Sequence, residues 1–157
     1  MKIILQRVAR GSVQVDGRTT GAIGHGYVAL VGIKRGDVKE DAHALARKTA
    51  ALRILPDGEG KMNRSLLDCD GEVLAISQFT LYADTRKGHR PGFSAAAPPE
   101  VARELYEDYV EALRRELGPD RVKTGVFQAQ MRVEIINDGP VTLELSSETR
   151  SSGSSTN

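Results

Sequence analysis

Hydrophobic and polar positions divide the chain into β-like segments and two helical segments. Residues 3–8 are rich in β-forming side chains, and residues 12–15 alternate apolar and polar positions. Asp16-Gly17 follows as a tight-turn signal. Residues 27–33 are apolar without polar alternation, which is typical of a buried strand. The N-terminal third therefore predicts a β-meander.

Two segments show helical periodicity. From 37 to about 53, small and apolar residues recur at helical spacing, and Asp37 followed by Glu40 resembles a capping box. From 99 to 117 apolar residues repeat every four positions, and Gly118-Pro119 follows as a stop signal. We therefore expect two main helices.

The remaining segments predict further strands. Strands are expected at 72–78 and 121–124, and the long polar connection 83–99 lies between them. A connection of this length in a compact domain is usually functional or mobile. Near the C-terminus, the pattern alternates on both sides of a turn-like segment. This predicts two strands around a tight connection, at 133–135 and 141–145.

Together these elements predict one mixed α/β domain. A chain of 157 residues fits a single domain, which buries roughly two-thirds of its unfolded surface without a metal or disulfide. The domain should cover residues 1–146. Residues 147–157 are mostly Ser, Thr and Gly, so we expect a disordered tail there.

Composition narrows the function classes. The chain has 22 Lys plus Arg against 21 Asp plus Glu, a net charge of +1, which excludes a strongly basic nucleic-acid coat protein but not a local basic patch. Cys69 is the only cysteine, which suits a reducing compartment. No signal-like start or membrane-length apolar run is present. We expect a cytoplasmic protein that does not enter a membrane.

Common cofactor motifs are absent from the sequence. His25, His43 and His89 form no metal-ligand spacing, and Cys69 has no thiol partner. Neither a phosphate-binding GxxxxGK[ST] loop nor a GxSxG nucleophile motif occurs. We therefore expect neither a metal nor a cofactor.

Two short segments remain as candidates for chemistry. Residues 77–81 place two hydroxyls and an amide at a strand end, where neutral groups suit an oxyanion or a water, although Ser and Thr are common at strand ends. Residues 137–140 (Asn-Asp-Gly-Pro) form either an ordinary turn or a rigid segment that senses the substituents on a nearby carbon atom. Proline at the head of a strand removes a ladder donor, and a Gly-Pro bond can be cis.

Together the two segments resemble the D-aminoacyl-tRNA deacylase family. Its SQxxL signature is present at residues 77–81, and its NxGPxT signature at residues 137–142. Three further stretches look like the family's first strand, its loop and the approach to its last hairpin, and the likeness covers residues 1–146. The resemblance implies mostly antiparallel sheets forming a partly open, barrel-like core with two main helices packed on it. The three stretches are residues 1–8, 86–93 and 124–131.

The resemblance also implies an activity. Members are homodimers that hydrolyse the ester between a D-amino acid and the 3′-terminal adenosine of tRNA, remove glycine from mischarged tRNA and spare L-aminoacyl-tRNA. By this match Gly139 and Pro140 are chirality sensors, joined by a cis bond, that reach into the partner subunit's active site. Arg7 holds the orientation of that dipeptide, and Phe127 and Met131 shape the adenosine pocket.

The chemical step has two readings. Thr80 is a nucleophile, which requires a base within hydrogen-bond reach, or the 2′-OH of the tRNA orients water while backbone N–H groups near Phe79 and Thr80 stabilise the oxyanion. We favour the second reading, because the matched residues are mostly neutral. The expected catalytic residues are Ser77, Gln78, Phe79 and Thr80.

The loop between residues 84 and 93 carries a net charge of +2. It is either a solvated surface loop or a contact for acceptor-stem phosphates, and we include Lys87 and Asn137 among the expected substrate-binding residues. Two other functions stay open. One is a tRNA-end binding module without hydrolysis, and the other is editing of an L-amino acid from tRNA.

Overall fold

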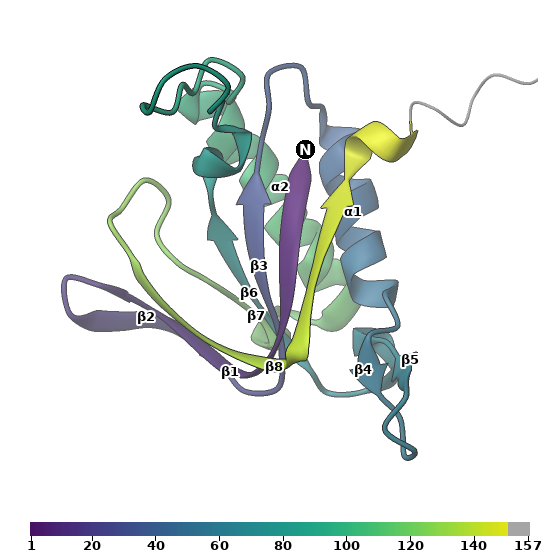
Figure 1. Cartoon of the computed structure of the whole chain (residues 1–157). Helices are drawn as coiled ribbons and strands as arrows, with labels where there is room; N and C mark the ends of the chain where they lie inside the picture. Colours follow the sequence, from purple (N-terminus) through teal and green to yellow (C-terminus); the bar gives the residue numbers. More distant parts are fainter. Residues whose placement is uncertain (151–157) are drawn as a thin grey trace, which may run out of the picture.

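The computed structural model describes the backbone of residues 1–150 and the side chains of residues 1–148. A curved six-stranded sheet has two helices packed on one face, and a small hairpin projects from its base (Figure 1). The strands are β1 (Lys2–Val15), β2 (Arg18–Ile23), β3 (Gly26–Gly32), β4 (Leu55–Pro56), β5 (Met62–Arg64), β6 (Glu72–Ser77), β7 (Val122–Thr124) and β8 (Arg132–Ser146). The helices are α1 (Lys39–Ala51), α2 (Pro99–Leu117) and the 3-10 turns η1 (Leu66–Asp68), η2 (Phe79–Tyr82), η3 (Pro119–Arg121) and η4 (Ser147–Arg150).

Strand β1 organises the sheet. Along one edge its first half pairs with β3 and its second half with β2, and β8 pairs with almost its whole length on the other edge. These pairings are antiparallel, whereas β3–β6 and β6–β7 are parallel. The sheet is therefore mixed and mostly antiparallel, as predicted.

The sheet curls until β2 lies against β6 and β7. A Cβ atom on Gly21 of β2 would stand 2.6 Å from the carbonyl oxygen of Thr124 and 3.2 Å from Leu74 Cδ1. Glycine permits this close approach because it has no side chain. β2 forms no hydrogen-bonded ladder with β7, so the barrel-like core is nearly but not fully closed.

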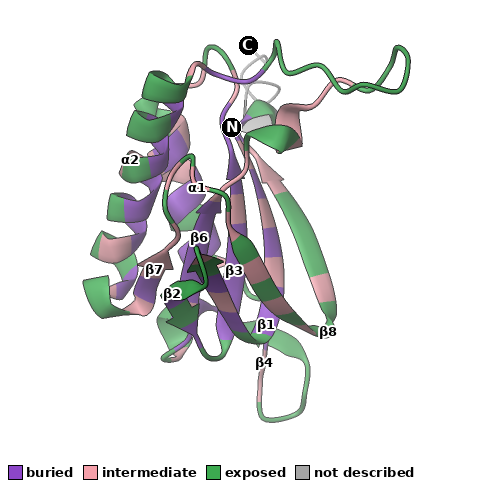
Figure 2. Ribbon diagram, turned by 90° about the vertical axis from the view of Figure 1, so that its left-hand side faces the viewer, coloured by how far each residue is buried: buried purple, intermediate pink, exposed green. Residues whose placement is uncertain are grey.

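Both faces of the central strands are buried, which explains the unbroken apolar run of β3. Alternate residues face the helices or the interior of the curled sheet, and Figure 2 shows the buried strands beside the helices. The helix side includes Ile3, Leu5, Tyr27, Ala29, Val31, Val73 and Ala75. The curled side includes Val8, Val13, Ile23, Val28, Leu74 and Ile76.

A buried polar contact joins the two helices. The Thr49 hydroxyl donates to the carbonyl oxygen of Leu45 at 2.8 Å, so it accepts from the Tyr109 hydroxyl at 3.0 Å. Burial raises the pKa of Tyr109. None of the helices described in residues 1–150 combines the length and apolar character needed to cross a bilayer.

The prediction of two strands near the C-terminus was wrong. The segments expected at 133–135 and 141–145 both belong to one strand, β8, and the β-rich segments 3–8 and 12–15 likewise lie in one continuous strand, β1. Both halves of β8 pair with β1 in the same antiparallel sense, so the chain does not reverse between them. A local pattern with a turn-like centre cannot distinguish a bulge from a hairpin.

The predicted cap of the first helix was also wrong. Val38 is the N-cap of α1, and its N–H donates to the carboxylate of Asp41 at 2.9 Å. The Asp37 carboxylate instead accepts from the Met1 nitrogen at 2.6 Å and the Lys34 N–H at 2.7 Å. A long-range contact with Met1 and a local one with Lys34 therefore engage the carboxylate that the sequence pattern had placed at the cap.

Residues 147 and 148, at the start of the segment expected to form a tail, contact the domain. Ser147 is buried, and its hydroxyl accepts a hydrogen bond from the Met1 nitrogen at 2.8 Å. Glu148 pairs with the Lys34 ammonium. Most of the expected tail, residues 151–157, lies outside the described residues, so its predicted disorder stays a prediction.

Candidate active site

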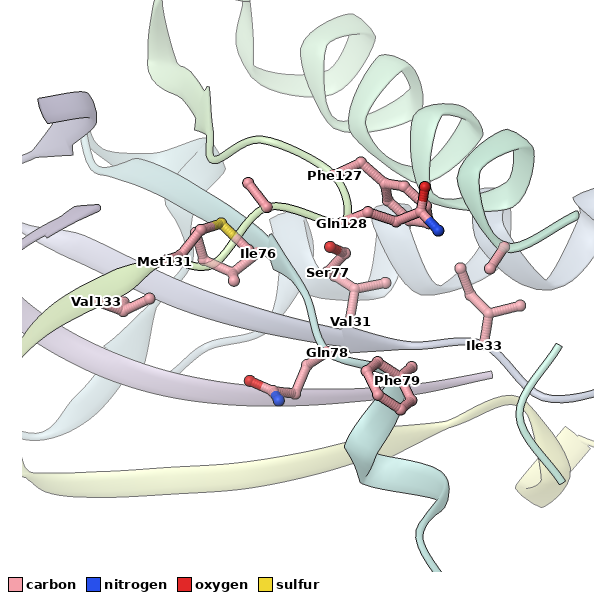
Figure 3. A pocket seen from close by; sticks show the side chains of 12 residues that line it. Val31, Ile33, Ile76, Ser77, Gln78, Phe79, Phe127, Gln128, Met131 and Val133 are labelled. Atoms are coloured by element: carbon pink, nitrogen blue, oxygen red, sulfur yellow. The ribbon is translucent and has the colours of Figure 1, made fainter. Parts of the chain in front are cut away.

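A cavity of about 270 Å³ opens where β3 and β6 end, beneath the start of α2 and the segment before β8 (Figure 3). The walls are mostly apolar. Three of the expected catalytic residues and both expected adenosine-pocket residues lie in the lining. The lining residues are Val31, Ile33, Ile76, Ser77, Gln78, Phe79, Ala102, Phe127, Gln128, Ala129, Met131 and Val133.

The end of β6 places the first group of these residues. Ser77 is opposite Val31 in the parallel ladder, and the Gln78 N–H donates to the Val31 carbonyl oxygen at 2.7 Å. The chain then leaves the sheet and enters η2 at Phe79. The first N–H groups of a helix have no intrahelical acceptor, so this turn presents free donors at the strand end.

Thr80 is exposed and does not line the cavity. Its hydroxyl accepts a hydrogen bond from the Gln78 amide. None of the twelve described lining residues has an acidic, basic or thiol side chain. This arrangement supplies polar, neutral groups at the cavity but no side-chain base beside Thr80.

Phe127 forms the opposite wall, and α2 supports it. The Tyr106 ring packs against it at 5.9 Å between centroids, and the Arg103 guanidinium lies 4.7 Å from its ring centroid. Met131 follows at the approach to β8, close against Gly125, where a Cβ would be 2.5 Å from the Met131 sulfur. Arg103 and Tyr106 could not be assigned to the site from the sequence, because nothing in the spacing of an amphipathic helix marks a contact with a distant loop.

The Gly139-Pro140 segment is a bulge in β8. Between the pairs Gln6–Thr142 and Val8–Asn137, β1 contributes one residue and β8 contributes four. The Gly139-Pro140 peptide bond is cis, both residues are exposed, and Gly139 has a φ of +122°. The bulge therefore projects its backbone away from the sheet.

Arg7 and Asn137 hold this bulge. Arg7 is 9% exposed, and its Nε donates to the Asp138 carbonyl oxygen at 3.1 Å while its Nη1 donates to the Ile54 carbonyl oxygen at 2.8 Å. The Asn137 amide donates to the carbonyl oxygens of Arg7 at 2.9 Å and Val141 at 3.0 Å. These bonds clamp the bulge at both ends and tie it to β1.

The structure separates the two groups of expected site residues within one chain. Arg7, under the bulge, is opposite Tyr27 of β3, whereas Ser77, at the cavity, is opposite Val31. Four residues along a strand correspond to about 13 Å. Gly139, Pro140, Arg7 and Asn137 do not line the cavity. A single chain therefore does not bring the bulge to its own cavity.

The long loop holding Lys87 is attached to the cavity by an aromatic contact. Phe93 packs edge-on against Phe79, with 5.0 Å between ring centroids. The Arg86 guanidinium binds both carboxylate oxygens of Asp84 and lowers the pKa of that carboxyl to about 2. This pairing leaves Lys87 and Arg90 as the loop's cations without an ion pair among the described residues.

No three His, Cys, Asp or Glu side chains cluster as a metal site within the described part of the chain.

The sequence model of the D-Tyr-tRNA(Tyr) deacylase family matches residues 4–146. The chain belongs to this family.

Similar proteins match over nearly the whole chain. The D-aminoacyl-tRNA deacylase of Anaeromyxobacter dehalogenans is 55% identical, with 94% of this chain and 97% of the relative covered. That of Carboxydothermus hydrogenoformans is 54% identical, with 91% and 97% covered. A solved structure described as c-Myc DNA Unwinding Element Binding Protein is 42% identical, covers 94% of this chain and 99% of its own, and superposes with a TM-score of 0.89. A probable eukaryotic D-amino acid tRNA deacylase, 18% identical with 92% and 97% covered, has a TM-score of 0.80 and shows the shared fold.

Proposed function

We propose that this protein hydrolyses the ester bond of D-aminoacyl-tRNA and thereby removes D-amino acids from translation in the cytoplasm. The observation that carries the proposal is the cavity at the end of β6, where the Ser77–Phe79 signature and Phe127 form two facing walls. Relatives more than 50% identical over most of the chain are D-aminoacyl-tRNA deacylases. The 3′-terminal adenosine would occupy the wall formed by Phe127 and Met131, and the ester would face Ser77.

The chemistry requires a positioned water and a stabilised oxyanion. Water adds to the ester carbonyl carbon, the carbonyl oxygen becomes an oxyanion, and collapse releases the amino acid while the ribose oxygen regains a proton. The N–H groups of Phe79 and Thr80 are suited to the oxyanion. Because none of the described residues that line the cavity carries a side-chain base, we assign the orientation of water to the neighbouring 2′-OH of the tRNA.

Selectivity is proposed to come from the bulge of a second copy. Gly139 and Pro140 are exposed, and Arg7 beneath them lies about 13 Å along the sheet from Ser77, so a homodimer with active sites at the subunit interface would use them in the partner's site. A backbone sensor excludes an L side chain by collision without contacting any particular D side chain. Glycine has no side chain that could collide with this sensor, so glycyl-tRNA would also be hydrolysed.

One assay tests the proposed function. Matched D-tyrosyl-tRNA, L-tyrosyl-tRNA and glycyl-tRNA are incubated with the full chain, and ester loss is measured against buffer alone. We expect rapid loss of the D and glycyl esters and persistence of the L ester. No loss of any ester would favour a binding module without hydrolysis, and loss of the L ester would favour editing of L-amino acids.

A second assay separates the two readings of Thr80. In the Thr80→Ala variant, we expect turnover of D-tyrosyl-tRNA to fall less than about tenfold, because backbone donors and the 2′-OH remain. The unmodified protein should lose turnover on a substrate whose terminal adenosine lacks the 2′-OH. Complete loss in Thr80→Ala, with normal turnover of the 2′-deoxy substrate, would make Thr80 the nucleophile.

A further inference from the structure

Gln128 has a backbone conformation that favours glycine. Its φ is +64°, and Asp16 is the other non-glycine residue with a positive φ in the described chain. The Ala129 N–H donates to the Val126 carbonyl oxygen at 3.2 Å, so Gln128 is the third residue of a β-turn. Glycine is the residue that such a position accepts without strain. A long side chain at this position strains the backbone, and a turn with only a structural role would avoid that strain by using glycine.

The Gln128 side chain lies at the cavity beside Phe127. Figure 3 places it on the segment before β8, across the cavity from Gln78 and Phe79. Its amide has no hydrogen-bond partner among the described residues, whereas the Gln78 amide is already bonded to Thr80. The wall opposite the expected chemistry therefore has one free amide next to one aromatic ring.

We propose that Gln128 recognises the base of the 3′-terminal adenosine. The inference rests on the proposed function and adds a specificity-determining residue to it. An amide side chain matches adenine with two hydrogen bonds: Oε1 accepts from the exocyclic N6 amine, and Nε2 donates to the ring nitrogen N7. Phe127 supplies a face on which a base can stack.

The surroundings of Phe127 support placing the base at this wall and the ester at the opposite one. Arg103 and Tyr106 hold the ring from the side of α2, so the aromatic wall is fixed before a base arrives. The polar lining side chains Ser77 and Gln78 belong to the opposite wall, beside η2. Gln128 is thus placed to bind the base edge, while the ester faces the strand end.

Binding measurements test Gln128 without relying on hydrolysis. We would titrate the full chain with adenosine 5′-monophosphate and with purine riboside 5′-monophosphate, which lacks the N6 amine. We expect the unmodified protein to prefer the adenine nucleotide by about tenfold. Gln128→Gly should bind both nucleotides equally, and Gln128→Glu, which cannot donate to N7, should bind the adenine nucleotide more weakly than the unmodified protein.

A matched control is available two residues away. Gln130 is exposed and does not line the cavity, so Gln130→Ala should keep the preference for adenine. Gln128→Gly should unfold at the same or a higher temperature, because glycine relieves the positive φ. A preference retained in Gln128→Gly, no preference in the unmodified protein, or a lower unfolding temperature would overturn the proposal.

Deacylation distinguishes failure of this inference from failure of the proposed function. D-tyrosyl-tRNA ending in adenosine or in purine riboside would be compared for kcat/KM in the unmodified protein and in Gln128→Gly. We expect the glycine variant to lose the discrimination between the two ends. If discrimination between D-amino acids changes instead, Gln128 contacts the amino acid and the inference fails. If no substrate is hydrolysed, the proposed function fails, and nucleotide binding still decides the role of Gln128.

Discussion

At the scale of single residues, Gly139 is the position in the bulge where a side chain would fit worst. Its φ is +122°, and a Cβ there would lie 2.8 Å from Arg7 Nη2 and 2.8 Å from Val141 Cγ2. Gly139→Ala should therefore lower the free energy of unfolding by about 1–3 kcal/mol and displace the bulge. Urea unfolding and deacylation of D-tyrosyl-tRNA measure the two effects, and both should decrease.

Gly60 separates backbone strain from collision. Its φ is +79°, but a Cβ there would meet no atom within 4 Å. Gly60→Ala should cost about 1 kcal/mol and leave deacylation unchanged, because the hairpin turn lies away from the cavity. Equal losses of stability in the two variants would show that Arg7 and Val141 do not confine residue 139.

Short sequence motifs contained several of the residues that line the cavity. Ser77, Gln78 and Phe79 line one cavity together with Phe127 and Met131, although their catalytic and binding roles remain predictions. The motifs contained these residues because each wall is a short continuous segment. Thr80 lies outside the lining, since η2 turns its side chain toward Gln78. Gln128 was missed because a positive φ is invisible in a sequence unless glycine marks it.

At the scale of elements, the loop after η2 is held by its own ion pair. Arg86 lowers the pKa of Asp84 from 3.8 to about 2, first through its side chain and then through its N–H. Because the pKa of Asp84 is lowered in the folded state, the pair with Arg86 stabilises the folded state at pH values above the ordinary aspartate pKa of 3.8. This stabilisation is lost as the pH falls through about 2. Arg86→Ala should return the Asp84 pKa toward 3.8, as followed by the carboxyl carbon shift in an NMR pH titration.

The charge of Arg90 provides the control for this titration. Arg90 belongs to the same loop but forms no ion pair with Asp84 in the described structure. Arg90→Ala should therefore leave the Asp84 pKa near 2. If Arg90→Ala raises the pKa as much as Arg86→Ala does, the general charge of the loop, rather than the direct pair, lowers the pKa of Asp84.

The same loop is where a phosphate contact is predicted. Since Arg86 is neutralised by Asp84, Lys87 is one of the cations left to bind acceptor-stem phosphates. Lys87→Ala should weaken tRNA binding and reduce the slope of log K against log salt by about 0.7–0.9 for one lost phosphate contact. Lys61→Ala, in the β4–β5 hairpin where Lys61 pairs with Glu59, should leave the slope unchanged. An unchanged slope for Lys87→Ala would leave the loop as a solvated surface.

The difference between the predicted and observed β8 belongs to this scale too. Asn-Asp-Gly-Pro is typical of a turn, and alternation on both sides predicts a hairpin. The structure keeps one strand, because Asn137 and Arg7 satisfy the backbone of the bulge while β1 pairs with both flanks. Helix α2 was predicted with its bounds, since its periodicity and its Gly118-Pro119 stop are local.

At the scale of the whole molecule, closure of the barrel-like core depends on Gly21. Gly21→Ala would place a Cβ 2.6 Å from the Thr124 carbonyl oxygen and separate β2 from β7. We expect a loss of about 1–3 kcal/mol in the free energy of unfolding, measured in urea. Gly24→Ala is the control, because the nearest atom to its Cβ would be Glu72 Oε1 at an ordinary 3.7 Å. Similar stabilities for the two variants would mean that β2 can move without cost.

The sequence by itself determined the kinds of element, the two helices and the positions of the two motifs, because each depends on residues close together in the chain. Only the tertiary structure decided that the motif around Gly139 is a bulge held by Arg7, and that it lies along the sheet from the cavity at Ser77. It also placed Gln128 at positive φ beside Phe127. These outcomes depend on which strands pair and in what register, and pairing is set by burying both faces of one sheet at once.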